Sequence, residues 1–174
     1  MPRTEDDDLQ AAFELLDKER WTEAIAKLEV LQTSADPEVR DKALNFLADA
    51  YAATGRNSDS EAMLRRSIEQ RGERNEGLGP QLAVLAPLVR RQGRIEEAEE
   101  IYARALDILR DDEPEIRVMT LRNIAYLYWT TGRLDRAREI YDRMPGYDEQ
   151  HLADLIEVMK PYVEPPLPDD VNRN

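Results

Sequence analysis

Small and apolar side chains recur along this chain at fixed intervals. Four times, two small residues stand twelve positions apart, and the pairs are Ala12 and Ala24, Ala48 and Ser60, Ala86 and Ala98, and Ala125 and Ala137. The first members of successive pairs are 36, 38 and 39 residues apart. An internal repeat of this length predicts supersecondary units that stack into an array and bury a shared core.

Each repeat has the pattern of two helices joined by a tight turn, as the fourth repeat illustrates. Its first half carries apolar residues at the helical spacing i, i+3, i+4 and i+7, which are Leu121, Ile124, Ala125 and Tyr128. Thr131, Gly132 and Arg133 interrupt this stripe, since glycine adopts the positive φ that ends many helices. A second stripe follows, formed by Leu134, Ala137, Ile140 and Tyr141. The small residues of each pair would let the two helices of a hairpin approach closely.

The predicted organisation is one all-α domain over residues 1–163. It contains about four hairpins, at about residues 5–35, 37–71, 79–110 and 114–144, and a capping helix at about 148–160. The capping helix would cover the last apolar surface of the array. The final segment, 164–174, is rich in proline and acidic residues, so we expect an extended or disordered tail.

Several helix starts are predicted from capping patterns. Residues 4–7 (TEDD) and 58–61 (SDSE) have the spacing of a capping box. Asp36 and Glu113 each precede a proline, which suits the first turn of a helix. Pro87 falls inside the first helix of the third repeat, where we expect a kink or a shortened helix.

Composition excludes several function classes. The formal net charge is −13 and the pI is about 4.6, which disfavours nucleic acids and anionic membranes as partners. The chain has no cysteine, no apolar run long enough to cross a membrane and an acidic N-terminal segment unlike a secretory signal, so we expect a cytoplasmic protein. Arginine outnumbers lysine, which favours a GC-rich bacterial source.

The repeated positions resemble the tetratricopeptide repeat family. The similarity rests on the small residues of both helices, the large apolar residue between them and a turn that contains Gly55, Gly93 or Gly132, with Glu19 in the first repeat. The departures are the long repeats, Glu19 in place of the turn glycine and Ser60 in place of alanine. The resemblance implies a right-handed α-solenoid whose first helices line a concave groove that binds peptides or helices of partner proteins.

No pattern in the chain predicts catalysis, a metal site or a cofactor. The single histidine, His151, falls in the predicted capping helix without neighbouring ligands, and the glycines lack the spacing of a phosphate-binding loop. We therefore expect a non-catalytic interaction module, either an adaptor or a scaffold.

The groove geometry implied by the resemblance selects the candidate binding residues. They are Asn45, Asp49, Arg90, Arg122, Tyr126 and Trp129. Arginine and aromatic residues are the types that anchor protein partners, and the arginines favour an acidic or carboxylate-bearing segment. Tyr126 and Trp129 have a second interpretation, in which they pack beneath the capping helix.

Two other functions stay open. The chain could assemble with itself, because Leu9, Phe13 and Leu16 are placed on the groove side of the first repeat and could receive a second copy. It could also be a regulatory subunit of an enzyme complex.

Overall fold

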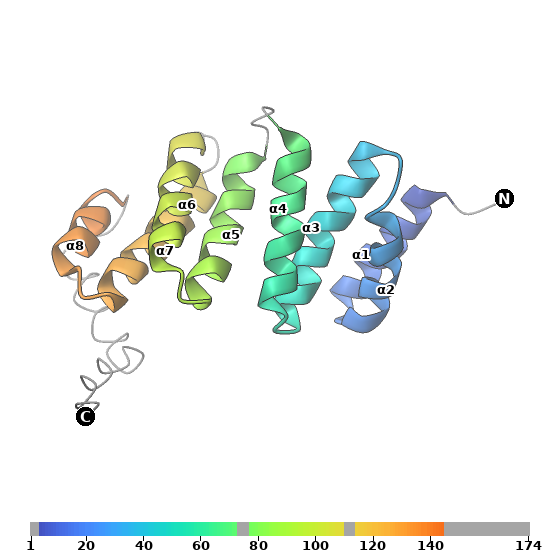
Figure 1. Ribbon diagram of the computed structural model, residues 1–174, viewed down its shortest axis with the longest axis horizontal. Coiled ribbons are helices and arrows are strands. Elements are labelled where there is room, and N and C mark those ends of the chain that lie inside the picture. Colours follow the sequence, from blue (N-terminus) through green and yellow to red (C-terminus); the bar gives the residue numbers. More distant parts are fainter. Residues whose placement is uncertain (1–3, 73–76, 110–113, 145–174) are drawn as a thin grey trace, which may run out of the picture. The chain divides into compact units, whose positions relative to one another are not determined.

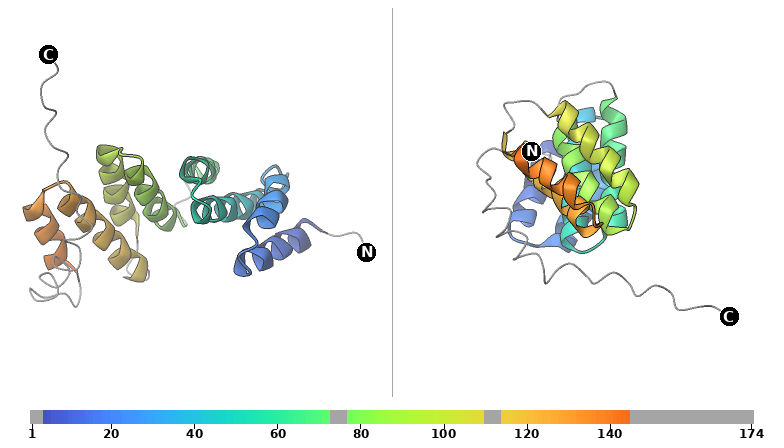
Figure 2. Two further views of the ribbon diagram at one scale, coloured as in Figure 1. Left: turned by 90° about the horizontal axis from the view of Figure 1, so that it is seen from below. Right: turned by 90° about the vertical axis from the view of Figure 1, so that its left-hand side faces the viewer.

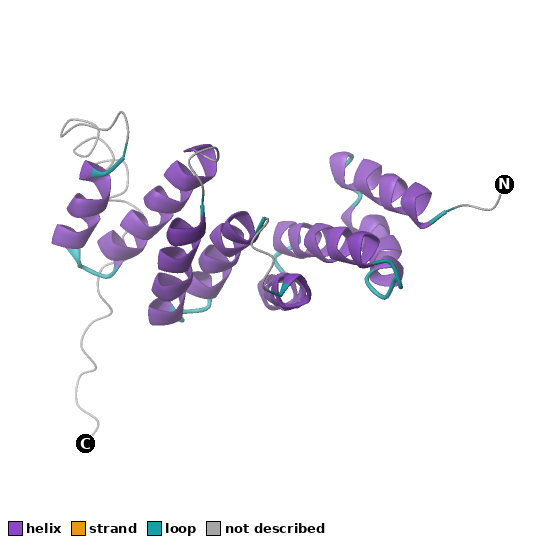
Figure 3. Cartoon of the chain, turned by 90° about the horizontal axis from the view of Figure 1, so that it is seen from above, coloured by secondary structure: helices purple, strands orange, loops and turns teal. Residues whose placement is uncertain are grey.

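The computed structural model describes residues 4–72, 77–109 and 114–144, and all secondary structure within these ranges is helical (Figures 1 and 3). The described residues form eight helices: α1 (Glu5–Asp17), α2 (Trp21–Leu31), α3 (Pro37–Ala53), α4 (Asn57–Arg71), α5 (Leu78–Arg91), α6 (Ile95–Ile108), α7 (Pro114–Thr130) and α8 (Leu134–Asp142). The all-α prediction is confirmed. The predicted capping helix (148–160) and tail (164–174) lie outside the described residues.

The chain divides into two compact units, Met1–Leu109 and Arg110–Asn174. The first unit contains the hairpins α1–α2, α3–α4 and α5–α6, and the two helices of the third hairpin lie side by side in a second view (green, Figure 2). Within this unit α2 packs on α3 and α4 packs on α5, so successive hairpins stack as in a solenoid. The second unit contains the hairpin α7–α8.

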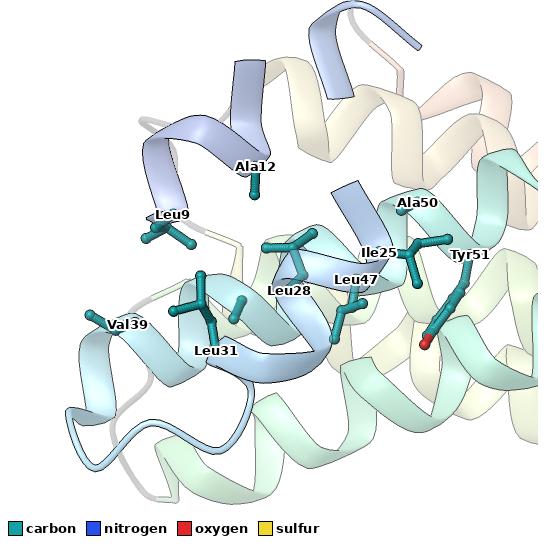
Figure 4. Close-up of a cluster of buried hydrophobic side chains, with 10 residues drawn as sticks. Leu9, Ala12, Ile25, Leu28, Leu31, Val39, Leu47, Ala50 and Tyr51 are labelled. Atoms are coloured by element: carbon teal, nitrogen blue, oxygen red, sulfur yellow. The ribbon is translucent and has the colours of Figure 1, made fainter. Parts of the chain in front are cut away.

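The small residue pairs lie in the interior of the hairpins. All eight members, from Ala12 to Ala137, are at most 1% exposed. In the first unit a cluster from three helices continues this core, with Leu9 and Ala12 of α1 facing Leu28 of α2 and Leu47 of α3 (Figure 4). Small side chains at the helix contacts and large ones around them give the close packing typical of protein interiors.

The turns within the four hairpins share one conformation. The second residue before each second helix is Glu19, Gly55, Gly93 or Gly132, and each of them precedes an arginine and has φ between 55° and 79°. The following arginine donates its backbone N–H to a carbonyl five residues earlier, as from Arg56 to Tyr51 at 2.8 Å. This is the bond of a Schellman motif, which satisfies a carbonyl at the helix end. Glu19 therefore adopts the same left-handed conformation as the three glycines.

The predicted starts of α1 and α3 are confirmed. The Thr4 hydroxyl accepts from the Asp7 N–H at 3.2 Å while the Asp7 carboxylate accepts from the Thr4 N–H at 2.9 Å. At α3, an oxygen of Asp36 accepts from the Glu38 N–H at 2.8 Å, and Pro37 occupies the first turn.

The capping box predicted at residues 58–61 is wrong. The helix α4 begins at Asn57, directly after the turn, so these residues lie inside it. The Ser60 hydroxyl instead crosses the hairpin and donates to the Ala48 carbonyl at 2.7 Å. The pattern failed because the turn at Gly55 had already set where the helix starts.

Three further positions differ from expectation. The helix α5 runs from Leu78 to Arg91 through Pro87, so the proline does not shorten it. Leu9 is buried in the core cluster and is unavailable to a second copy. Leu134, assigned to the inner stripe of α8, is 52% exposed because it is the first residue of that helix, next to the turn.

Candidate protein-binding faces

The six candidate residues fall on three first helices, in two separate sets. Asn45 and Asp49 lie on α3 and Arg90 lies on α5, all in the first unit. The other set lies on α7 in the second unit and consists of Arg122, Tyr126 and Trp129. The two sets therefore belong to different units.

The second-unit face follows one side of α7. Arg122 is exposed, and Tyr126 and Trp129 are half-buried at i+4 and i+7 from it. Tyr128 lies off this face and is buried in the hairpin, as its stripe predicts. The Trp129 indole Nε1 is buried, and no acceptor for it lies within the described part of the chain. Buried donors are nearly always paired in native proteins, so this N–H is an exception among the described residues.

Asn45 takes part in a polar network that joins the second and third hairpins. Its Nδ2 donates to the Ser67 hydroxyl at 3.2 Å, and its Oδ1 accepts from Gln81 Nε2 at 2.7 Å. Asp41 extends the network by accepting from Ser67 and from the Arg71 guanidinium, both at 2.5 Å. Ser67 and Gln81 are buried, so the network links α3, α4 and α5 away from solvent. Asn45 is thus engaged internally, which a sequence register alone does not reveal.

Asp49 has a different environment from the other acidic residues near it. It is exposed and forms no ion pair with any described residue. Even so, the surrounding helices remove part of its water, and this desolvation raises its pKa. The charged form of the Asp49 carboxyl is therefore disfavoured at this position, and a nearby cation would stabilise it.

Glu61 shows the opposite outcome for a carboxylate on α4. Burial opposes its ionisation, but hydrogen bonds from Arg94, Arg65 and Gln92 outweigh this effect and lower its pKa. The Glu61 Oε1 atom lies 2.5 Å from Arg94 and 2.7 Å from Arg65. Glu61 thus links α4 to the turn of the third hairpin through its bonds to Arg94 and Gln92.

Arg90 lies on α5, half-buried, near the phenol of Tyr102 on α6. Desolvation raises the pKa of Tyr102 to about 12, and the Arg90 charge acts in the opposite direction. Tyr102 Oη is buried, and within the described part of the chain Arg90 acts on its pKa first through its charge. Part of the Arg90 charge is therefore directed toward the interior of its own hairpin.

Two cavities lie in the first unit. One of about 730 Å³ opens where α3 begins and α4 ends. Its three lining cations are already bound, Lys42 to Glu38, Arg71 to Asp41 and Arg40 to the Ser34 carbonyl. The other, of about 310 Å³, has an apolar floor and a rim of both charges, formed by Arg65, Ile68, Glu69, Leu82, Leu85, Glu100, Ile101 and Arg104. Within the described ranges, no group of three or more acidic or histidine side chains could hold a metal ion, and no helix is long and apolar enough to cross a membrane.

The family of the chain follows from a comparison of its sequence with known protein families. The sequence profile described as tetratricopeptide repeat matches residues 38–111 and 81–143, which together exceed half of the 174 residues. The chain belongs to the tetratricopeptide repeat family. No curated protein sequence matches it closely enough to count as a relative.

Solved structures show the same tetratricopeptide fold at low sequence identity. A kinesin light chain protein of Podospora anserina with nearly identical TPR-like repeats is 20% identical, with a TM-score of 0.66 over 92% of this chain and 81% of that one. BtubC of P. vanneervenii is 20% identical, with a TM-score of 0.62 over 89% of this chain and 66% of that one. MamA is 17% identical, with a TM-score of 0.64 over 95% of this chain and 80% of that one. Tetratricopeptide repeat proteins are generally non-catalytic and mediate contacts between proteins.

The family register selected Arg122, Tyr126 and Trp129 on one side of α7 but gave no sign of the internal network. The signal for the network is present in the sequence: Ser67 and Gln81 are polar residues one turn from core leucines, Leu64 and Leu85. Polar residues at such positions need partners, and here the partners are each other.

Proposed function

We propose that this tetratricopeptide repeat protein is a non-catalytic adaptor or scaffold that holds a peptide or helix of another protein. The observation that carries the proposal is the face of α7, where an exposed arginine and two aromatic residues share one side. Arginine, tyrosine and tryptophan are enriched among the residues that dominate binding energy.

The residues of this face have distinct proposed roles. The Arg122 guanidinium binds a carboxylate of the partner, because it offers several donors to one planar group. The Trp129 indole and the Tyr126 ring, both half-buried, pack against an apolar side chain of the partner. The partner segment is accordingly acidic where it meets α7.

In the first unit, Asp49 and Arg90 are proposed to contact the partner, whereas Asn45 supports them. The amide of Asn45 is hydrogen-bonded to Ser67 and Gln81, so it is proposed to hold α3 in position and not to contact the partner itself. We place the protein in the cytoplasm of a bacterium, without nucleic acid or membrane partners, on the basis of its net charge of −13 and its arginine-rich composition.

A second candidate function, self-assembly, is favoured by two exposed apolar side chains on second helices. Val30 of α2 is 71% exposed and Leu134 of α8 is 52% exposed. A size in light scattering that grows with protein concentration, and that Val30→Ser and Leu134→Ser abolish, would support this function over the adaptor.

The adaptor function is tested with a labelled acidic peptide and with an affinity pull-down from bacterial lysate. Wild type is compared with Arg122→Glu and Trp129→Ala, and Arg138→Glu on the exposed surface of α8 is the matched control. We expect Arg122→Glu to weaken peptide binding roughly tenfold or more, since like charges oppose each other at an interface. Arg138→Glu should bind as wild type does, and circular dichroism should show equal helicity in all variants.

Equal binding by wild type and Arg122→Glu would refute the assignment of α7. A prey protein retained by wild type and lost by both α7 variants would identify the partner.

A further inference from the structure

The α1–α3 side of the first unit carries an exposed aromatic pair. Phe13 of α1 and Phe46 of α3 lie with ring centroids 5.6 Å apart and tilted by 44°. Phe46 packs against the core cluster, and Phe13 is 41% exposed. The apolar core therefore continues to the surface at this pair, where an apolar side chain of a partner could pack against the rings.

Acidic side chains surround this pair. Asp17 follows Phe13 by four residues on α1, and Asp49 follows Phe46 by three residues on α3, so each lies beside a ring on the same helix face. Both carboxylates are exposed, and neither forms an ion pair with a described residue. The face formed by Phe13, Phe46, Asp17 and Asp49 thus combines an apolar centre with unneutralised negative charge.

The lysine four residues before Phe46 on α3 is already neutralised. Lys42 of α3 lies 2.6 Å from Glu38 and is also under the influence of Asp6 on α1. On the two helix stripes that carry the rings, Asp6, Asp17, Glu38 and Asp49 stand against Lys42, so the charge of these stripes is negative. Partial desolvation raises the pKa of the exposed Asp49 carboxyl, and a cation placed beside it would favour its charged form.

We propose that the face formed by Phe13, Phe46, Asp17 and Asp49 docks a basic amphipathic helix of a partner protein. An apolar side chain of that helix covers the two rings, and a lysine or arginine one turn away binds Asp49. Residues three or four apart on the partner helix lie about 5–6 Å apart, which is also the separation expected between Phe46 and Asp49 on α3. The apolar and basic side chains of the partner can therefore meet Phe46 and Asp49 together. The proposal rests on the adaptor function and adds a second face whose charge preference is opposite to that of α7.

Charge complementarity selects this occupant over segments of the same chain. A second copy also carries a net charge of −13, and the C-terminal segment 164–174 contains Glu164, Asp169 and Asp170 against one basic residue, Arg173. Each would bring negative charge to a negative face, which costs binding energy.

The experiment uses the full chain and fluorescence anisotropy. The probe is an alanine-based helical peptide with leucines on one face and a lysine four positions from each leucine, and its control has glutamate in place of each lysine. The variants are Asp49→Asn and Phe13→Ser, and Asp107→Asn is the matched control at an exposed position on α6.

Wild type should bind the lysine peptide more tightly than the glutamate peptide, with a preference that fades as salt is added. Asp49→Asn should weaken binding of the lysine peptide about fivefold, as expected for loss of one exposed ion pair. It should unfold at the same or a higher urea concentration than wild type, because a desolvated charge is removed. A residue needed only for the fold would show the opposite effect on unfolding.

Equal binding of the two peptides by wild type, no saturable binding of the lysine peptide, or unchanged affinity in Asp49→Asn would overturn the proposal. The Arg122→Glu variant separates this result from the adaptor test, since it should bind the lysine peptide as wild type does. Failure of the acidic peptide alone would count against the face of α7, and failure of the lysine peptide alone would count against the Asp49 face.

Discussion

The first two hairpins, α1–α2 and α3–α4, differ at the two positions where the repeat pattern is least regular. In the first hairpin the turn residue is Glu19, with a φ of 55°, and the buried pair is Ala12 and Ala24. In the second the turn residue is Gly55, with a φ of 76°, and the pair is Ala48 and Ser60. Both turns nevertheless make the same backbone bonds, and both pairs are fully buried.

The difference shows which requirements of the hairpin are strict. A small side chain is needed at both buried positions, whereas its polarity can vary if a hydroxyl finds an acceptor. A left-handed residue is needed at the turn, whereas a side chain there is tolerated at a cost. Three sets of substitutions test this ranking, from the strict requirement to the permissive one.

The largest effect is expected where both hairpins agree, at the buried small residues. Ala24→Leu should lower the free energy of unfolding by about 1–3 kcal/mol, because a larger side chain at a fully buried helix contact forces the hairpin apart. Ala26→Leu is the matched control, since Ala26 is exposed on the same helix. Urea unfolding followed by circular dichroism measures both, and equal stability of the two variants would show that the close contact is not required.

An intermediate effect is expected at the turns. Glu19→Gly should raise the free energy of unfolding by about 0.5–1 kcal/mol, because glycine removes the strain of a left-handed residue but adds freedom to the unfolded chain. The reciprocal Gly55→Glu should lower it by about 1–2 kcal/mol, and the cost is backbone strain since a Cβ at Gly55 would meet nothing within 4 Å.

Both turn variants are measured by urea unfolding under the same conditions. Destabilisation by Glu19→Gly would mean that the glutamate side chain contributes a contact worth more than the strain it carries.

The fold was predictable because its rules are local. The twelve-residue interval, the helical stripes and the turn glycines depend on residues within one hairpin, and the burial of Ala86, Ala98 and Tyr102 follows from them. The failures occurred where two local signals compete. At residues 58–61 a capping pattern competed with the turn at Gly55, and the turn prevailed.

The binding faces were less predictable because they depend on residues far apart in the sequence. Asp41 and Asn45 become part of an internal network only because Ser67 of α4 and Gln81 of the next hairpin reach them. Asp49 lies on the same helix, but no described cation reaches it. Helical register can place a side chain on a face, but only the three-dimensional structure shows whether its hydrogen-bonding groups are already used.

The smallest effect is expected at Ser60, the polar member of the second hairpin's pair. Ser60→Ala removes the 2.7 Å bond to the Ala48 carbonyl but leaves no buried donor behind, so stability should change by less than about 1 kcal/mol. The reciprocal Ala24→Ser introduces a hydroxyl into the first hairpin at the equivalent buried position. If that hydroxyl reaches the Ala12 carbonyl as Ser60 reaches Ala48, its cost in urea unfolding should be equally small. A loss greater than about 2 kcal/mol in Ala24→Ser alone would indicate an unpaired hydroxyl, and the two hairpins would then differ in backbone spacing as well as in sequence.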